Sequence, residues 1–172
     1  MLLSVVTYPD KRLKKISTDV EEFGEELHSL LDNMYETMIE KNGIGLAAIQ
    51  VGIDQRVLII NIPDEEGVQH RENLLEIINP VIKETQGTTE HQEGCLSVPE
   101  FYEDITRYEN LILEYQDRDA ATCTIEAKEL LSIAIQHEID HLDGKLFIDK
   151  LSYSKRKKFE KEYKKLQKQK KS

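Results

Sequence analysis

The sequence has little cysteine, glycine or proline and no long apolar run. Its two cysteines, Cys95 and Cys123, cannot form the disulfide framework of a small secreted domain. Eight glycines and four prolines in 172 residues exclude a collagen-like chain. No apolar segment approaches the roughly 18 residues that a membrane helix needs, and the N-terminal residues lack the basic start of a signal peptide. We therefore expect a soluble, cytoplasmic protein that does not associate with membranes.

The charge is large and unevenly distributed. Acidic residues outnumber basic residues by 33 to 23, so the formal net charge is −10. Residues 154–172 nevertheless carry a net charge of +8, and residues 1–153 carry −18. We expect one folded domain over residues 1–153 and a basic helical tail over residues 154–172. The tail favours contact with an anionic partner, although a solvated helix end would have the same composition.

Three segments have the apolar spacing of helices. The first, Val20–Glu40, places one apolar stripe on a helix face, formed by Phe23, Leu27, Leu30, Leu31, Met34 and Met38. The second, from about Ile125 to Leu142, is apolar on nearly all sides, which predicts a buried central helix. The tail also has apolar residues on one helix face, namely Phe159, Tyr163 and Leu166.

Three shorter segments are rich in β-branched and aliphatic residues, which favours strands. These are Arg56–Asn61, Leu74–Asn79, which we expect to end at Pro80, and Asn110–Tyr115. Helix, strands, helix and helix in this order predict an α+β fold. We expect antiparallel or mixed β-sheets packed around the central helix, with one helix near each end of the chain.

The segment His137-Glu138-Ile139-Asp140-His141 carries the clearest chemical signal. Its two histidines are four residues apart on the central helix, so both imidazoles can reach one metal ion. Glu138 follows the first histidine and is placed to act on a water molecule at the metal. An exposed polar stripe on a surface helix is the alternative, but the surrounding apolar residues argue against it.

A catalytic metal site usually needs a third protein ligand. The spacing of one large group of metallopeptidases requires a histidine where Phe147 stands, and the downstream acids Glu160 and Glu162 are expected to be exposed. Cys95, in a glycine-containing turn, would complete a Cys-His-His set suited to zinc or ferrous iron. A small buried cysteine is the alternative for that residue, and His91 is a second candidate ligand.

The loop from Gly43 to Gln50 is the third notable segment. Gly43 and Gly45 allow the backbone to approach a ligand closely. The Gln50 side chain is a neutral donor that could stabilise a developing oxyanion.

Together, these three segments resemble the motifs of the peptide deformylase family. Gly43-Ile44-Gly45-Leu46-Ala47-Ala48-Ile49-Gln50 is similar to the family's first motif, Glu93-Gly94-Cys95-Leu96-Ser97 to its second and Gln136–His141 to its third. Their order and spacing also agree, and the resemblance extends over roughly residues 4 to 150.

The resemblance implies a metal-dependent hydrolase that releases formate from N-formylmethionyl nascent peptides. Cys95, His137 and His141 would bind one divalent metal, usually Fe²⁺ in the cell, with Zn²⁺, Ni²⁺ or Co²⁺ able to substitute. Glu138 would transfer protons. The amide of Gln50 and the backbone N–H of Leu96 would stabilise the oxyanion. The implied substrate-binding residues are Ile44, Gly45, Gly94, Leu130, Ile133, Ala134 and Arg107.

Three residues depart from the family pattern and bear on specificity. Glu129 stands where glycine is common, His91 where apolar residues are common, and Tyr102 where some members have arginine.

Two other functions stay open at this stage. A zinc endopeptidase would share the two-histidine helix. An RNA-associated module with a structural metal would explain the basic tail, which could also dock a deformylase on ribosomal RNA where nascent chains emerge.

Overall fold

The computed structural model describes the backbone of residues 1–171 and the side chains of residues 1–169. Three α-helices and five strands follow one another along these residues: α1 (Glu25–Glu40), β1 (Gly45–Ala47), β2 (Val57–Ile60), β3 (Leu75–Cys95), β4 (Val98–Gln116), β5 (Thr122–Lys128), α2 (Glu129–Leu142) and α3 (Tyr153–Lys171). Ser172, the last residue of the expected tail, lies outside the described residues. No helix among those described is long and apolar enough to cross a membrane.

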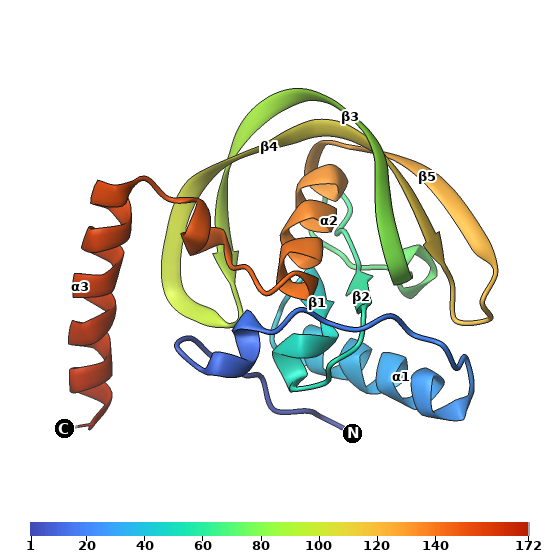
Figure 1. Ribbon diagram of the computed structural model, residues 1–172, viewed down its shortest axis with the longest axis horizontal. Coiled ribbons are helices and arrows are strands. Elements are labelled where there is room, and N and C mark those ends of the chain that lie inside the picture. The colour runs from blue at the N-terminus through green and yellow to red at the C-terminus, as the bar shows by residue number, and fades with distance from the viewer. Residues whose placement is uncertain (172) are drawn as a thin grey trace.

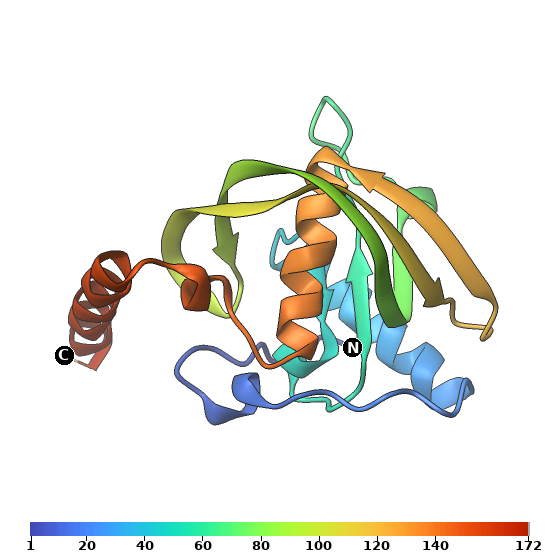
Figure 2. The same ribbon diagram turned by 45° about the horizontal axis from the view of Figure 1, so that its top comes forward.

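The five strands form one antiparallel sheet in the order β1-β2-β3-β4-β5. Strands β3 and β4 make a long ribbon that curves around α2, and β5 continues the sheet along one side (Figures 1 and 2). Helix α1 lies on the other side of β1 and β2 from α2 (Figure 1). The expected α+β fold with a central helix is confirmed, and the sheet is antiparallel throughout.

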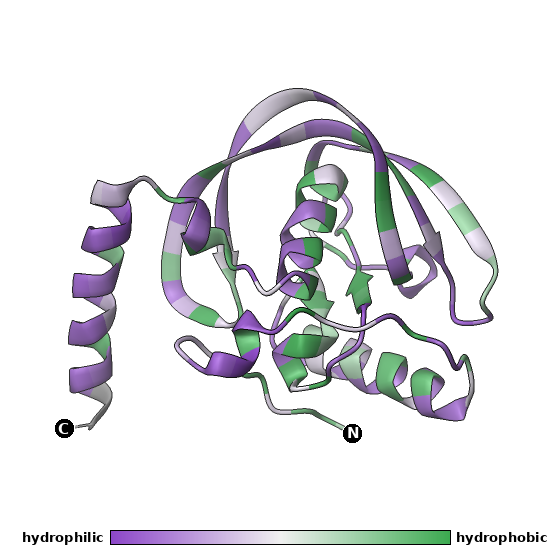
Figure 3. Ribbon diagram, in the orientation of Figure 1, coloured by the Kyte–Doolittle hydropathy of each residue, from purple (hydrophilic) through white to green (hydrophobic). Residues whose placement is uncertain are grey.

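Strand β2 is buried on both faces, which explains its unbroken apolar sequence. Leu58 and Ile60 belong to the apolar cluster beneath α2, whereas Val57 and Ile59 belong to the cluster beneath α1. Side chains alternate between the two faces of a strand, so one short strand joins both clusters. Figure 3 shows the same pattern, with hydrophobic residues gathered on β1, β2 and parts of the two covering helices.

A third apolar cluster attaches α3 to the rest of the molecule. Phe159 is completely buried there, together with Val6, Leu13, Val98, Ile105, Leu146, Phe147 and Ile148. Its ring centroid lies 4.5 Å from that of Phe101 and 5.5 Å from that of Tyr8. The tail is helical, as predicted, and its first half is packed against the core, although most of α3 is hydrophilic (Figure 3).

The first helix begins later than its apolar stripe predicts. It starts at Glu25, after Gly24, and the preceding residues are not helical. The Val20 N–H donates to the Asn79 side chain, which holds this segment in an extended path beside β3. The helix therefore starts at Glu25 and not at Val20, because Gly24 is unfavourable inside a helix.

The expected strand end at Pro80 is also wrong, since β3 continues to Cys95. Pro80 lies where the pairing of β3 with β4 shifts register, between Ile78 and Val81. Asn79 adopts a φ of 52° at this point. A bulge of this kind accommodates proline because no ladder hydrogen bond is needed from its nitrogen.

The central helix is shorter than predicted, because residues 122–128 form β5 and only Glu129 starts α2. Strand β5 pairs with β4 through Ile125 opposite Leu113 and Ala127 opposite Leu111. The alternation of polar and apolar residues in this segment fits a half-buried strand.

Candidate active site

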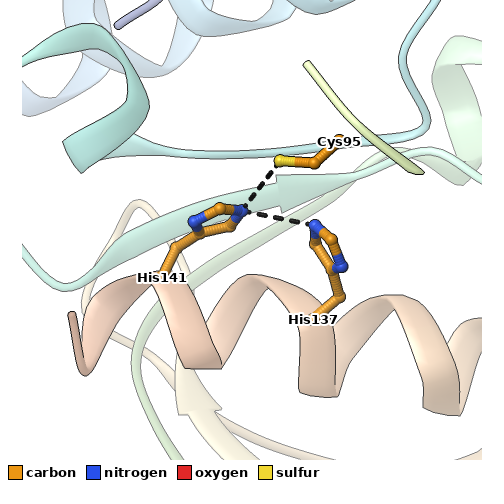
Figure 4. Close-up of side chains that lie close together, drawn as sticks. All are labelled: Cys95, His137 and His141. Atoms are coloured by element: carbon orange, nitrogen blue, oxygen red, sulfur yellow. Dashed lines mark hydrogen bonds between the residues drawn. The ribbon is translucent and has the colours of Figure 1, made fainter. Parts of the chain in front are cut away.

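Cys95, His137 and His141 meet between the end of β3 and one face of α2 (Figure 4). The His141 Nε2 atom lies 3.3 Å from the Cys95 Sγ atom and 3.3 Å from the His137 Nε2 atom. All three ligand atoms lie within 4.8 Å of one another. Four residues on one α-helix make slightly more than one turn, which brings the two imidazoles together.

The donor set and its spacing fit a metal ion. Ligands with bond lengths of about 2.0–2.3 Å and tetrahedral angles lie about 3.3–3.6 Å apart, and the two measured separations, 3.3 Å, fall in that range. Burial lowers the pKa of His137, but Glu138, Cys95 and Glu93 outweigh it and raise that pKa well above its ordinary value. Burial and the charges of His137 and Arg107 lower the pKa of His141 well below its ordinary value, so this imidazole is neutral and can act as a metal ligand.

A buried chain of polar contacts supports His137 from behind. Its Nδ1 atom lies 2.8 Å from a Glu93 carboxylate oxygen. Arg107 donates two hydrogen bonds of 2.8 Å to Glu93 and a third, of 2.6 Å, to Asp140. Burial raises the pKa of Glu93, but the hydrogen bonds from Arg107 and His137 prevail and lower it to about 2. A carboxylate thus orients the ring so that Nε2 faces the His141 Nε2 atom and the rest of the ligand set (Figure 4).

Glu138 is buried beside the ligands and close to β1. Its Oε1 atom has no hydrogen-bond partner among the described side chains and lies 4.0 Å from the His141 Nε2 atom. Burial raises the pKa of its carboxyl to about 7. A Cβ atom at Gly45 would lie only 2.7 Å from the Glu138 Oε2 atom. Glycine at this position therefore makes room for the carboxylate.

Gln50 has a fixed orientation at the other side of Cys95. Its Oε1 atom accepts a hydrogen bond of 2.9 Å from the Ala47 N–H. Its Nε2 atom donates to the Ser97 Oγ atom at 3.1 Å and reaches the Cys95 Sγ atom at 3.5 Å. Because the amide oxygen is already engaged, the NH₂ group is the part that faces the cysteine.

A cleft of about 740 Å³ opens above these groups. Of the residues predicted to act, it is lined by Gln50, Cys95, Leu96, His137 and Glu138, together with Ile44, Gly45, Gly94, Leu130, Ile133 and Ala134. His91 and Tyr102, the two departures expected near the cleft, also line it. His141 lies beneath, completely buried.

Arg107 and Glu129 are placed differently from the other candidates. Arg107 does not line the cleft, because its buried guanidinium is enclosed by Glu93 and Asp140. Glu129 is also outside the cleft wall and adopts a φ of 54° at the start of α2. That conformation favours glycine, which accounts for the glycine expected at this position.

Sequence analysis gave no role to Glu93 or Phe147, which both contact His137. Glu93 forms the carboxylate contact described above, and the Phe147 ring stacks against the imidazole at a centroid distance of 6.1 Å. Glu93 was detectable as an acid two residues before a candidate metal ligand. Phe147 had no such signal, because the turn that brings it back against α2 is set by tertiary packing.

Comparisons with known proteins agree on one family. The family model described as polypeptide deformylase matches residues 2–157. A peptide deformylase of Helicobacter pylori is 60% identical over 170 residues, covering 99% of this chain and 98% of that protein. One from Wolinella succinogenes is 61% identical over 166 residues, with coverages of 96% and 98%.

Solved structures give the same result. A peptide deformylase from Legionella pneumophila aligns with a TM-score of 0.88 and 38% identity, covering 97% of this chain and 98% of that one. The Ehrlichia chaffeensis peptide deformylase in complex with actinonin aligns with a TM-score of 0.86 and 40% identity, with coverages of 95% and 96%.

Proposed function

The chain belongs to the polypeptide deformylase family and removes the formyl group from N-formylmethionyl peptides, and from this premise we propose which residues carry out the reaction. Cys95, His137 and His141 hold one divalent metal ion. The observation that supports this assignment is the convergence of their three ligand atoms beside Glu138 on the cleft. When bound, the metal supplies Lewis-acid polarisation of the formyl oxygen and a water molecule of lowered pKa.

We propose ferrous iron as the metal in the cell, with zinc, nickel and cobalt as substitutes. The sulfur and two nitrogens of this site suit all four ions, so availability decides among them more than affinity. Glu93 contributes by holding the His137 ring, with Arg107 and Asp140 behind it, which keeps the ligand in place.

Glu138 acts as the proton carrier. It takes a proton from the attacking water and delivers one to the amine that leaves the formyl carbon. Its unpartnered Oε1 atom and its position on the cleft support this role. A buried carboxylate oxygen without a donor costs free energy of folding, and an oxygen in this state is free to accept a proton from water.

Gln50 and the backbone N–H of Leu96 stabilise the oxyanion. The fixed Gln50 amide presents its NH₂ group on the Cys95 side of the cleft, where negative charge develops on the formyl oxygen. The peptide backbone pairs with the segments at Ile44, Gly45 and Gly94. The methionine side chain enters the apolar part of the cleft at Leu130, Ile133 and Ala134.

The test is the hydrolysis of formyl-Met-Ala-Ser by protein loaded anaerobically with iron(II). Glu138→Ala should keep its metal and lose about 10²–10⁴-fold in kcat, the usual contribution of general acid–base catalysis. Glu126→Ala removes an exposed acid from β5 and should behave like the unaltered protein. An active Glu138→Ala enzyme would contradict the assignment, and internal peptide fragments would indicate an endopeptidase instead.

We also propose that residues 1–153 carry the catalytic function and that the basic tail docks on ribosomal RNA in the cytoplasm. The outward-facing lysines of α3 support this, since Lys161, Lys164, Lys165 and Lys168 are exposed while Phe159 is buried. Deleting the tail would therefore expose the core as well.

Glutamate at Lys161, Lys164, Lys165 and Lys168, which are four of the exposed lysines, tests the charge alone. Co-sedimentation with ribosomes should decrease in this variant, and in the unaltered protein it should decrease as salt is raised, because counterion release drives such binding. Unchanged co-sedimentation in both tests would leave α3 as a solvated helix.

A further inference from the structure

A second cavity adjoins the active-site cleft and shares part of its wall. Its volume is about 510 Å³, and the residues that belong to it alone are Tyr8, Pro9, Asp10, Tyr163, Leu166 and Gln167. Thr7, Pro99 and Glu100 line both spaces. The two cavities therefore lie next to each other, and the second one reaches α3, which stands near the turn between β3 and β4 (Figures 1 and 2).

The wall formed by α3 is held in place. The Tyr163 hydroxyl donates a hydrogen bond to the Tyr8 carbonyl oxygen, and the two rings meet edge to face at 5.2 Å. Phe159, one turn earlier on α3, is completely buried. The second cavity is therefore a built part of the fold, and its α3 side lies mostly beyond residue 157, where the family model stops matching.

Glu100 supplies a free negative charge where the two cavities meet. It is exposed and adopts a left-handed φ of 66°, which is uncommon for a glutamate. No hydrogen bond or ion pair engages its carboxylate among the side chains that the structure describes. Asp10, on the same wall, is already paired with Arg12 at 2.9 Å. Glu100 is thus the carboxylate available to a ligand.

We propose that the second cavity receives the part of the peptide beyond the formylmethionine and that Glu100 selects chains with a basic side chain there. The formyl end must lie at Glu138 and the metal ligands, so the rest of a longer chain has to leave the cleft. The second cavity adjoins the cleft at the shared wall and offers the rings of Tyr8 and Tyr163, the side chain of Leu166 and one free carboxylate to a chain that leaves there. The proposal rests on the deformylase reaction.

The first experiment compares formylated hexapeptides. In formyl-Met-Ala-Ala-Ala-Ala-Ala, lysine, glutamine or glutamate replaces alanine in turn at positions three to six, and kcat/KM is measured at low salt. At one or more positions we expect lysine to exceed glutamate by about fivefold, the size of one exposed ion pair. Formyl-Met-Ala, too short to reach α3, reports the deformylase reaction separately.

Two variants then test whether Glu100 causes the preference for lysine over glutamate in the peptide. Glu100→Gln should reduce the lysine-to-glutamate ratio to about that of a neutral groove, close to one. Glu65→Gln removes the same charge from a distant exposed loop and should leave the ratio unchanged. An unaltered ratio in Glu100→Gln, or an equal decrease in both variants, would overturn the proposal, because the preference would then come from the net charge of the whole protein.

The α3 wall has its own test. Leu166→Ala should reduce the gain in kcat/KM that accompanies lengthening the peptide from two to six residues, whereas Lys165→Ala, on the exposed face, should not. If Leu166→Ala lowers the melting temperature, Gln167→Lys is used in its place, and it should weaken the preference for lysine. No gain with length in the unaltered protein would show that the chain leaves the cleft elsewhere.

Discussion

At the scale of single residues, the contact between Gly45 and Glu138 couples two of the three motifs. Gly45 belongs to β1 and Glu138 to α2, and the carboxylate of one occupies the space where a side chain of the other would start. Glycine at position 45 thus contributes to the site because it has no side chain that would displace the carboxylate. Its backbone also remains free to face the peptide in the cleft.

Gly45→Ala is predicted to lower kcat/KM strongly while the metal content stays unchanged. The new methyl group would lie 2.7 Å from the Glu138 Oε2 atom and must displace it, and a shift of about 1 Å in a catalytic group can cost about 10²-fold in rate. Metal analysis and formate release on the same sample measure both effects.

Gly24→Ala is the matched control, because a Cβ atom there meets nothing within 4 Å. Full activity in Gly45→Ala, with metal bound, would mean that the carboxylate tolerates displacement and that this contact has no role in the reaction.

The sequence identifies the residues of the site most directly where they are neighbours along the chain, and it misses contacts that form only when distant strands pair. His137, Glu138 and His141 are recognised because a helix brings i and i+4 together. The Glu93–Arg107 pair forms only when β3 and β4 fold back on each other. The resemblance implied Arg107 as a substrate-binding residue, whereas the structure pairs its charge with Glu93 and Asp140 inside the fold.

At the scale of elements, α3 combines a basic exposed face with an aromatic buried one. Phe159 contacts Phe101, which stacks against Phe147, and Phe147 stacks against His137. The tail helix is therefore linked by ring contacts to a candidate metal ligand. A helix that was solvated on all sides would leave Phe159 exposed, whereas this side chain is completely buried.

Phe159→Ala is predicted to destabilise the whole protein by about 3 kcal/mol or more, the usual cost of such a cavity. Lys165→Ala, an exposed residue of the same helix, should change the free energy of unfolding by less than about 0.5 kcal/mol. Urea denaturation of both variants measures the difference. Equal stabilities would indicate that α3 folds separately from the rest of the chain.

The ribbon of β3 and β4 contains strand residues that the hydropathy of the sequence does not reveal. Its open end, where the start of β3 pairs with the end of β4, carries apolar runs and was predicted, but residues 83–92 of β3 are polar on both faces and mostly exposed. Nothing in their hydropathy distinguishes them from a loop, because their order comes from pairing with β4. The buried strand β2 and the apolar helix α2 had strong local signals.

At the scale of the whole molecule, the candidate metal site joins the end of the sheet to the central helix. Cys95 and His141 are 46 residues apart in sequence, but the Cys95 Sγ atom lies 3.3 Å from the His141 Nε2 atom. An ion bound by both stabilises only the folded state, since the unfolded chain does not hold the ligands together.

Metal removal is therefore predicted to lower the melting temperature, and addition of zinc or anaerobic iron(II) to restore it. At 100 times the dissociation constant the gain is about 2.7 kcal/mol, which corresponds to a shift of about 5–10 °C for a chain of this size. Differential scanning calorimetry with and without metal measures the shift.

Variants of the two cysteines test whether the metal-induced shift in melting temperature depends on Cys95. Cys95→Ser should reduce the metal-induced shift, because a hard oxygen replaces a soft thiolate. Cys123→Ser, on β5, should keep the full shift. Equal shifts in the two variants would exclude Cys95 as a ligand.

The same separation of Gln50, Cys95 and His141 along the chain makes catalysis a reporter of folding. No single helix or hairpin holds these three residues, so with the roles proposed for them we expect formate release only after β3 and β4 have paired and α2 has docked. Helices form within microseconds, whereas long-range strand pairing is slow. In a refolding experiment, the helical signal should therefore return first, and enzymatic activity should return with the last long-range contacts.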